Sequence, residues 1–106
     1  MRKIPLVLAS AVAAVLALPV QAGPVDDAMN KAGCMACHQK DKKLVGPSFK
    51  DIAAKYKGQA DAVAKLADKV RKGGAGVWGP VPMAPNAADK INDADLKAAI
   101  ELILKS

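Results

Sequence analysis

Aromatic residues are almost absent from this chain of 106 residues: Phe49, Tyr56 and Trp78 are the only three. Aromatic rings bury a large area each and dominate many small cores, so this chain has little with which to build one. The scarcity also argues against nucleic-acid binding, which commonly stacks bases on aromatic side chains interleaved with basic ones. We therefore expect a large apolar cofactor to complete the core.

Histidine and cysteine are equally scarce, because His38, Cys34 and Cys37 are the complete set. A structural zinc site takes four such ligands, so zinc is disfavoured. One disulfide would be ordinary for an exported chain, whereas a thioredoxin-like C-x-x-C requires a βαβ setting. No segment alternates polar and apolar residues with a period of two, so the sequence predicts no sheet.

The chain lacks a comfortable membrane span, since its longest apolar run, from Ile4 to Leu18, has 15 residues against the roughly 20 that a bilayer requires. Two basic residues precede this run, and Val20 and Ala22 provide small residues before a break. This order is typical of a cleaved signal peptide. We expect residues 1–22 to be removed and the protein to reach the periplasm, with an uncleaved membrane anchor as the alternative.

Loss of this leader leaves 84 residues, 23–106, which we expect to form one domain. Domains of this size bury only roughly 60–65% of their unfolded surface and often require a staple. The net charge of +6 falls to about +4 without the two basic residues of the leader. Excess positive charge favours docking to an acidic partner surface, although most of the lysines are as easily explained as a solvated face.

Four helical segments are predicted from the residue pattern. The last two carry apolar residues at the i, i+3, i+4, i+7 spacing of one helix face. The predicted helices are residues 26–32, 49–56, 60–72 and 93–104. Residues 73–90 contain four glycines and three prolines, which disfavour helix. A loop of this length in so small a domain is usually functional.

The segment Cys34-Met35-Ala36-Cys37-His38 is a C-x-x-C-H motif, the pattern of c-type haem attachment. Two thiols three residues apart can add to the two vinyl groups of one haem. The next residue, His38, then lies under the iron, where its neutral imidazole is the proximal ligand. The motif therefore predicts one covalently bound haem c, with a disulfide, a redox dithiol or a metal site as alternatives.

The far side of that iron requires another ligand, and no second histidine is present. Met35 lies inside the attachment motif, and Met29 precedes it by about one helical turn, on the side of His38. Met83 lies 45 residues after His38 and directly after Pro82. We therefore predict Met83 as the distal ligand, with a core-filling role as the alternative.

Ligation by histidine and methionine gives a comparatively high reduction potential and leaves no open position on the iron. This favours a mobile electron carrier and not an enzyme. The alternatives are a small peroxidase or nitric-oxide-handling haem protein, a haem-free dithiol protein, or a soluble subunit of a larger complex.

Together the residues resemble the small bacterial cytochrome c-551/c-552 family, a class I group. The resemblance covers essentially all of residues 23–106. It rests on residues 33–38, Val45-Gly46-Pro47, residues 51–56, and residues 76–83 followed by Asn86. The resemblance implies an all-α fold of four short helices wrapped around one covalently attached haem, the cytochrome c fold.

The resemblance also implies roles for individual residues. Pro47 would offer its carbonyl to the second nitrogen of His38, Trp78 would donate its indole hydrogen to a haem propionate, and Asn86 would lie near the Met83 sulfur. The implied partners are redox proteins that dock at the exposed haem edge of a monomer. Acceptors of this kind are terminal oxidases, nitrite reductases and cytochrome c peroxidases, and the donor is a membrane cytochrome complex.

Two features depart from the family pattern. The crossing of the first and last helices often carries aromatic residues, and the matching positions here are Met29 and Leu102. The usual arginine near a propionate is replaced by Lys69, with Arg71 two residues later. Lysine lacks the planar fork of arginine, so the sequence leaves open which basic residue contacts the propionates.

Overall fold

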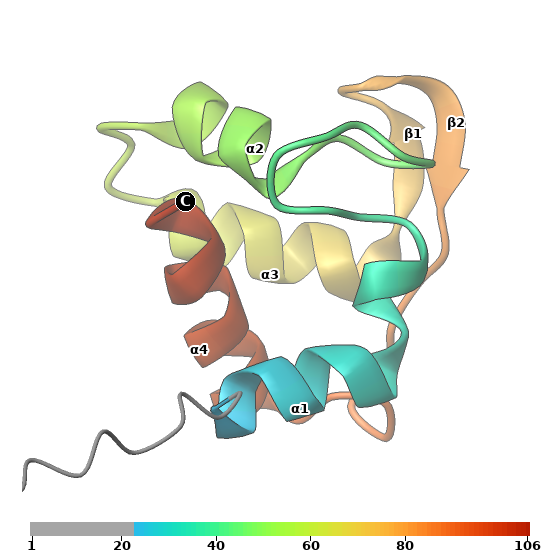
Figure 1. Ribbon diagram of the computed structural model, residues 1–106, viewed down its shortest axis with the longest axis vertical. Coiled ribbons are helices and arrows are strands. Elements are labelled where there is room, and N and C mark those ends of the chain that lie inside the picture. The colour runs from blue at the N-terminus through green and yellow to red at the C-terminus, as the bar shows by residue number, and fades with distance from the viewer. Residues whose placement is uncertain (1–22) are drawn as a thin grey trace, which may run out of the picture.

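The computed structural model describes residues 23–106, and the predicted signal peptide of residues 1–22 lies outside the described residues. Four α-helices form most of the fold: α1 (Pro24–Ala32), α2 (Phe49–Tyr56), α3 (Ala62–Lys72) and α4 (Asp93–Leu104). A short 3₁₀ helix, η1 (Cys34–Ala36), follows α1. Helix α4 contacts each of the other three α-helices and is therefore the central element (Figure 1). The mostly helical fold is confirmed.

The bounds of the helices follow from their ends. Helices α2 and α4 match their predicted ranges, and each begins at a side-chain cap: Ser48 Oγ accepts the N–H of Asp51 at 3.1 Å, and Asn92 Oδ1 accepts that of Asp95 at 2.8 Å. Helix α1 begins two residues earlier than predicted because Pro24 is tolerated in a first turn. Helix α3 begins two residues later than predicted, at Ala62.

The expectation of no sheet is wrong. Strands β1 (Gly74–Gly76) and β2 (Gly79–Met83) form an antiparallel hairpin inside the segment that was predicted to be a loop. Gly74 pairs with Met83, and Gly76 pairs with Gly79. Most residues of both strands are exposed, so no buried face imposes a period of two on the sequence. The hairpin places Met83 at the end of β2, beside the C-terminus of α3.

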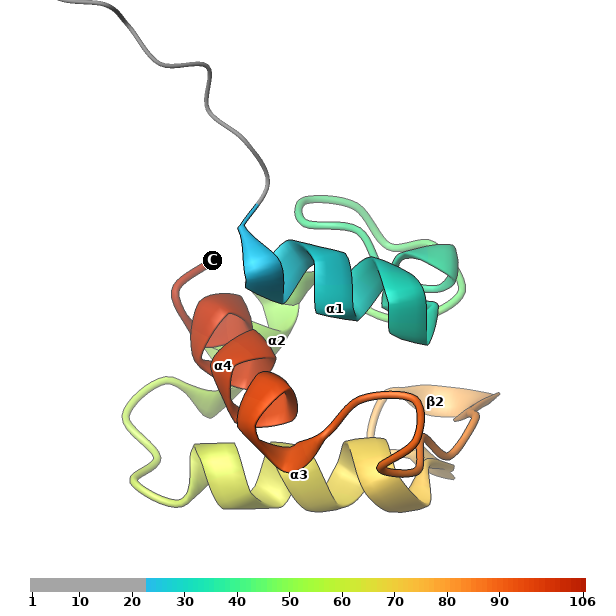
Figure 2. The same ribbon diagram turned by 90° about the horizontal axis from the view of Figure 1, so that it is seen from below.

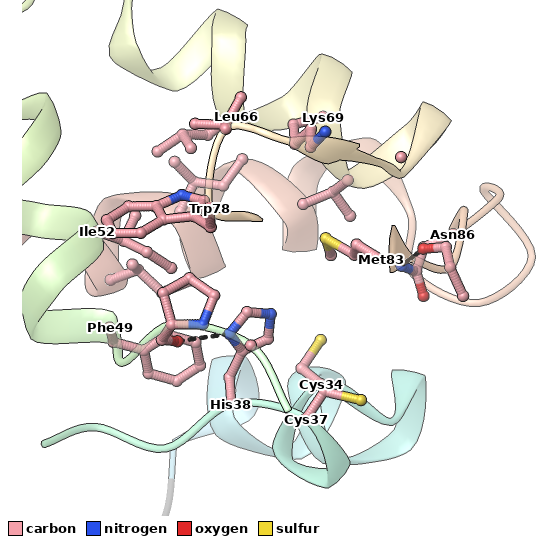
Figure 3. A pocket seen from close by; sticks show the side chains of 18 of the residues that line it. Cys34, Cys37, His38, Phe49, Ile52, Leu66, Lys69, Trp78, Met83 and Asn86 are labelled. Atoms are coloured by element: carbon pink, nitrogen blue, oxygen red, sulfur yellow. Dashed lines mark hydrogen bonds between the residues drawn. The ribbon is translucent and has the colours of Figure 1, made fainter. Parts of the chain in front are cut away.

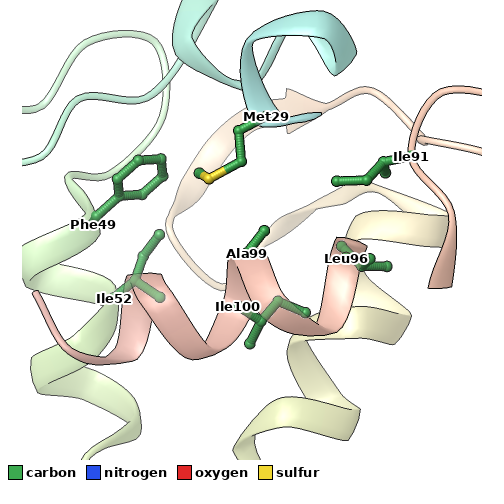
Figure 4. Close-up of a cluster of buried hydrophobic side chains, with 7 residues drawn as sticks. All are labelled: Met29, Phe49, Ile52, Ile91, Leu96, Ala99 and Ile100. Carbon is green, nitrogen blue, oxygen red and sulfur yellow. The ribbon is translucent and has the colours of Figure 1, made fainter. Parts of the chain in front are cut away.

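The core lies between α4 and the other helices (Figure 4). Its fully buried members are Met29, Phe49, Ile52, Ile91, Leu96, Ala99 and Ile100. Leu102, which was predicted to lie opposite Met29 at the helix crossing, is 41% exposed, whereas Ala99 is buried in the same cluster as Met29. In Figure 4, Met29 points toward Ala99 instead. The crossing is aliphatic, as predicted, but a small residue of α4 forms it.

Viewed from below, α1 and α3 lie on opposite sides of the molecule, with the hairpin near the end of α3 (Figure 2). Among residues 23–106, no helix is long and apolar enough to cross a membrane.

Candidate functional site

A cavity of about 590 Å³ lies between η1 and the hairpin. This volume is within the range of about 300–1,000 Å³ that is usual for pockets that bind small molecules and cofactors. Apolar residues of all four α-helices contribute to its lining. All seven residues predicted for the site line this one cavity: Cys34, Cys37, His38, Pro47, Trp78, Met83 and Asn86.

The wall that follows α1 carries the C-x-x-C-H motif. Gly33 ends α1 with a left-handed conformation (φ 84°), which turns the chain into η1. The N–H groups of Cys37 and His38 both donate to the Cys34 carbonyl, at 3.3 and 3.0 Å. This tight turn brings two free thiols and one imidazole to the same side of the cavity (Figure 3).

The orientation of the His38 ring is determined by its hydrogen bond. His38 Nδ1 lies 2.8 Å from the carbonyl oxygen of Pro47. A carbonyl can only accept, so Nδ1 carries the hydrogen and Nε2 keeps its lone pair in the neutral ring. This is the form in which a histidine binds a metal through Nε2, with the other nitrogen donating to a carbonyl.

Two neighbours hold the same ring in place. Phe49 stacks on it, with ring centroids 5.5 Å apart and planes 23° apart. Gly46 approaches so closely that a Cβ there would lie 2.5 Å from His38 Cε1. The N–H of Gly46 donates to the Cys37 carbonyl at 2.8 Å, which ties this loop back to the motif. His38 is therefore fixed on several sides before any metal is considered.

Cys34 differs from the reactive cysteine of a redox dithiol. Burial raises the pKa of the Cys34 thiol above its ordinary value; a backbone hydrogen bond partly offsets this, and the nearby Cys37 raises it further. Reactive cysteines of disulfide oxidoreductases have lowered pKa values. The site therefore favours the neutral form of the Cys34 thiol, which does not suit dithiol exchange.

The opposite wall carries Met83. Figure 3 shows its sulfur pointing into the cavity from the side opposite His38. Gly73 makes this position possible: a Cβ there would collide with the Met83 carbonyl and would lie 2.8 Å from the nitrogen of Pro85. Its φ of 66° and ψ of −148° also belong to a region that is essentially restricted to glycine.

The other two methionines differ from Met83 in position. Met29 lies on α1, where it is buried in the core and also lines the cavity, whereas Met35 is exposed on η1. Figure 3 places Asn86 next to Met83, where its side-chain amide donates to the Ala84 carbonyl at 3.1 Å.

The rim of the cavity carries positive charge. Trp78 lies on the rim, 41% exposed, with Lys55 Nζ 5.1 Å from the centre of its ring. Lys69 lines the cavity, whereas Arg71 donates to the carbonyls of Asn86 and Ile91. Of the three basic residues on the last turn of α3, which are Lys69, Arg71 and Lys72, Lys69 is the one that lines the cavity.

This set of donors fits a haem. The cavity is large and apolar, one wall offers two thiols beside an imidazole with a free Nε2, and the facing wall offers a thioether. Thioether and imidazole are the axial ligands of cytochromes c.

Sequence analysis missed several residues that shape the site. Gly46, Gly73 and Phe49 approach or stack on the segments that carry His38 and Met83, and Arg71 binds the segment after Met83. For Gly46, its position directly before Pro47 was a usable signal. For Arg71, no sequence pattern could have indicated carbonyl partners 15 and 20 residues away.

Comparison with known proteins agrees with this geometry. The sequence profile of the family Cytochrome c matches residues 26–106. The chain is 54% identical to cytochrome c2 of Rubrivivax gelatinosus, over 72% of this chain and 89% of that protein. It is 50% identical to cytochrome c-552 of Nitrosomonas europaea, over 74% of each. The crystal structure of wild-type cytochrome c552 from Nitrosomonas europaea superimposes with a TM-score of 0.68 at 49% identity, covering 74% of this chain and 95% of that one.

The fold, the sequence and the chemistry of the cavity thus agree. The chain belongs to the cytochrome c family, as a small class I member of the c-551/c-552 group, and is an electron carrier with one covalently bound haem c.

Proposed function

We propose that this protein shuttles single electrons in the periplasm through a haem iron bound by His38 Nε2 on one side and Met83 Sδ on the other. Cys34 and Cys37 attach the haem, each S–H adding across one vinyl double bond so that no group leaves. The observation that carries the proposal is the position of His38 and Met83 on facing walls of one apolar cavity beside the paired thiols.

When bound, the haem supplies one-electron chemistry at its iron. The chain supplies two axial ligands, so neither substrate nor oxygen finds a vacant position, and a carrier is favoured over an enzyme. The Pro47 carbonyl lies 2.8 Å from His38 Nδ1, and this hydrogen bond makes His38 Nε2 a better electron-pair donor to a metal. The methionine and the apolar lining both favour a comparatively high potential.

The rim of the cavity supports docking to redox partners. Four of its exposed residues are apolar and large: Val45, Val77, Trp78 and Val81. Lys55 and Lys69 lie beside them. We propose that a monomer presents this rim to an acidic surface around a partner's own redox centre. Acceptors would be a terminal oxidase, a nitrite reductase or a cytochrome c peroxidase, and the donor would be a membrane cytochrome complex.

Two further roles belong to this proposal. Trp78 donates its indole hydrogen to a propionate at the rim, where Lys69 supplies a nearby positive charge. Asn86 lies beside the Met83 sulfur and restrains it. The leader of residues 1–22 directs export and is removed, which delivers the protein to the periplasm.

The test is substitution of Met83 by alanine. We expect Met83→Ala to keep its haem but to lose the weak sulfur-to-iron charge-transfer band of the oxidised protein. Cyanide should then bind quickly, and the potential should fall by roughly 0.1 V or more, within the range that axial ligands set. Visible spectra and potentiometry measure these effects.

The matched control is Met35→Ala, because Met35 is exposed on η1. This variant should keep the band and the potential of the parent protein. If Met83→Ala retains the band and binds cyanide no faster than the parent, Met83 is not the ligand. A colourless parent protein would carry no haem and would refute the proposed function as a whole.

A further inference from the structure

The segment that follows Met83 is bound to the last turn of α3 by its backbone. The N–H of Asn86 donates to the Val70 carbonyl at 2.9 Å. The carbonyl of the same residue accepts from Arg71 Nη1 at 3.2 Å. Asn86 lies three residues after Met83. Both of its backbone polar groups are thus paired with consecutive residues of α3, Val70 and Arg71.

Arg71 also binds the other end of this segment. Its Nη1 donates to the Ile91 carbonyl at 2.8 Å, and its Nη2 lies 2.6 Å from Asp93 Oδ1. Ile91 directly precedes the cap of α4, and Asp93 is the first residue of that helix. One guanidinium therefore connects the end of α3, the segment after Met83 and the start of α4.

The carbonyl contacts matter more than the ion pair. The Arg71 side chain is only 23% exposed, whereas the Asp93 carboxylate is 94% exposed, and exposed ion pairs contribute little. Hydrogen bonds from a charged donor are roughly twice as strong as neutral ones. The fork of arginine lets Nη1 serve the two carbonyls while Nη2 meets the carboxylate, a geometry that a lysine ammonium does not reproduce.

We propose that Arg71 is a positioning residue for the Met83 sulfur: it holds the segment after Met83 against α3 and so slows departure of the sulfur from the iron. This rests on the proposed function, in which Met83 is the distal ligand. Arg71 acts through the backbone of residues 86–91 and does not itself face His38. Removing it leaves the bond from Asn86 to Val70, so the chain can still fold.

The experiment measures how fast imidazole replaces Met83 in the oxidised holoprotein. At high imidazole concentration this rate stops rising and equals the rate at which the sulfur leaves the iron. We expect Arg71→Met to raise this limiting rate about 10- to 100-fold, the range that loss of one charge-assisted hydrogen bond, the bond to the Asn86 carbonyl, implies. Arg71→Lys should lie between Arg71→Met and the parent, and Asp93→Asn should change the rate less than threefold.

The matched control is Lys72→Met. Lys72 lies on the same turn and also pairs with an acidic residue, Asp68, at 2.9 Å, but its side chain is 75% exposed. Lys72→Met removes one positive charge, as Arg71→Met does, but it removes no hydrogen bond to the segment after Met83. Its limiting rate should therefore stay within twofold of the parent. Equal rates for Arg71→Met and Lys72→Met would show a charge effect and overturn the proposal.

Other outcomes also decide the proposal. A limiting rate for Arg71→Met within twofold of the parent overturns it. If Arg71→Met yields no holoprotein, the limiting rate is measured in Arg71→Lys instead. A limiting rate in Arg71→Lys equal to that of the parent would then overturn the proposal. Absence of the sulfur-to-iron band in the parent would instead refute Met83 ligation, so failure of the proposed function is recognised separately.

Discussion

The two walls of the cavity position their side chains in different ways. On one wall the His38 ring itself is held, by the Pro47 carbonyl, by the stacked Phe49 ring and by the close approach of Gly46. On the other wall Met83 lies at the end of a mostly exposed hairpin, and the contacts that place it are made by backbone of residues 83–91. A ligand that is held through its ring is fixed more firmly than one that is held through its backbone.

Chain connectivity strengthens this difference. His38 directly follows one attachment cysteine, whereas Met83 lies 45 residues further on. In the proposed ligation, attachment would therefore keep the His38 imidazole near the iron even when the surrounding chain loosens. The sulfur is held only as well as the hairpin and α3 hold it. We expect the distal side of this protein to open first under any stress.

The largest expected effect comes from removing the attachment itself. In Cys34→Ser combined with Cys37→Ser, the proximal wall loses its covalent link, and we expect almost no stable red protein. The reason is the small core, which is built around the cavity and has Phe49 as the one aromatic residue among its buried members in residues 23–106. Purification yield and extraction of haem into acidified organic solvent measure this effect. A stable product whose haem resists extraction would contradict covalent attachment through these thiols.

The next effect compares one chemical change on the two walls, Gly73→Ala against Gly46→Ala. Gly73→Ala meets both a backbone strain and a collision with the Met83 segment, so we expect a loss of about 2–5 kcal/mol in the free energy of unfolding. Gly46→Ala meets only the collision with the His38 ring, for an expected loss of about 1–3 kcal/mol. Denaturant unfolding of both holoproteins measures these losses.

The spectra of the same two variants sharpen the comparison. Gly73→Ala should weaken or remove the sulfur-to-iron band while the haem stays attached, because its new methyl group displaces the backbone of Met83. Gly46→Ala should keep the band but shift the potential, because the ring moves relative to Pro47. If both variants keep the band, the distal side is as firmly held as the proximal side, and the contrast between the walls is wrong.

Much of the fold and the site could be predicted from the sequence because the relevant signals are local. Caps and apolar spacing marked the helices to within two residues, and the C-x-x-C-H motif identified one wall of the cavity. The hairpin could not be predicted, since its strands are short, mostly exposed and rich in glycine. Sequence spacing alone does not determine which residue of α4 meets Met29, because Ala99 and Leu102 are three residues apart and their side chains differ by only about 60° around the helix.

The smallest effect compares two helix caps, one beside each wall. Ser48 caps α2 directly after Pro47, and Asn92 caps α4 directly after Ile91, where Arg71 binds. Loss of a cap costs about 1 kcal/mol, so Ser48→Ala and Asn92→Ala should each lower the melting temperature by roughly 4–8 °C.

At equal loss of stability, only Asn92→Ala should accelerate replacement of Met83 by imidazole, because the start of α4 belongs to the distal side. Thermal unfolding and imidazole kinetics on the same two samples measure both quantities. Equal acceleration in both variants would mean that departure of the sulfur follows global stability and not the local attachment of the distal segment.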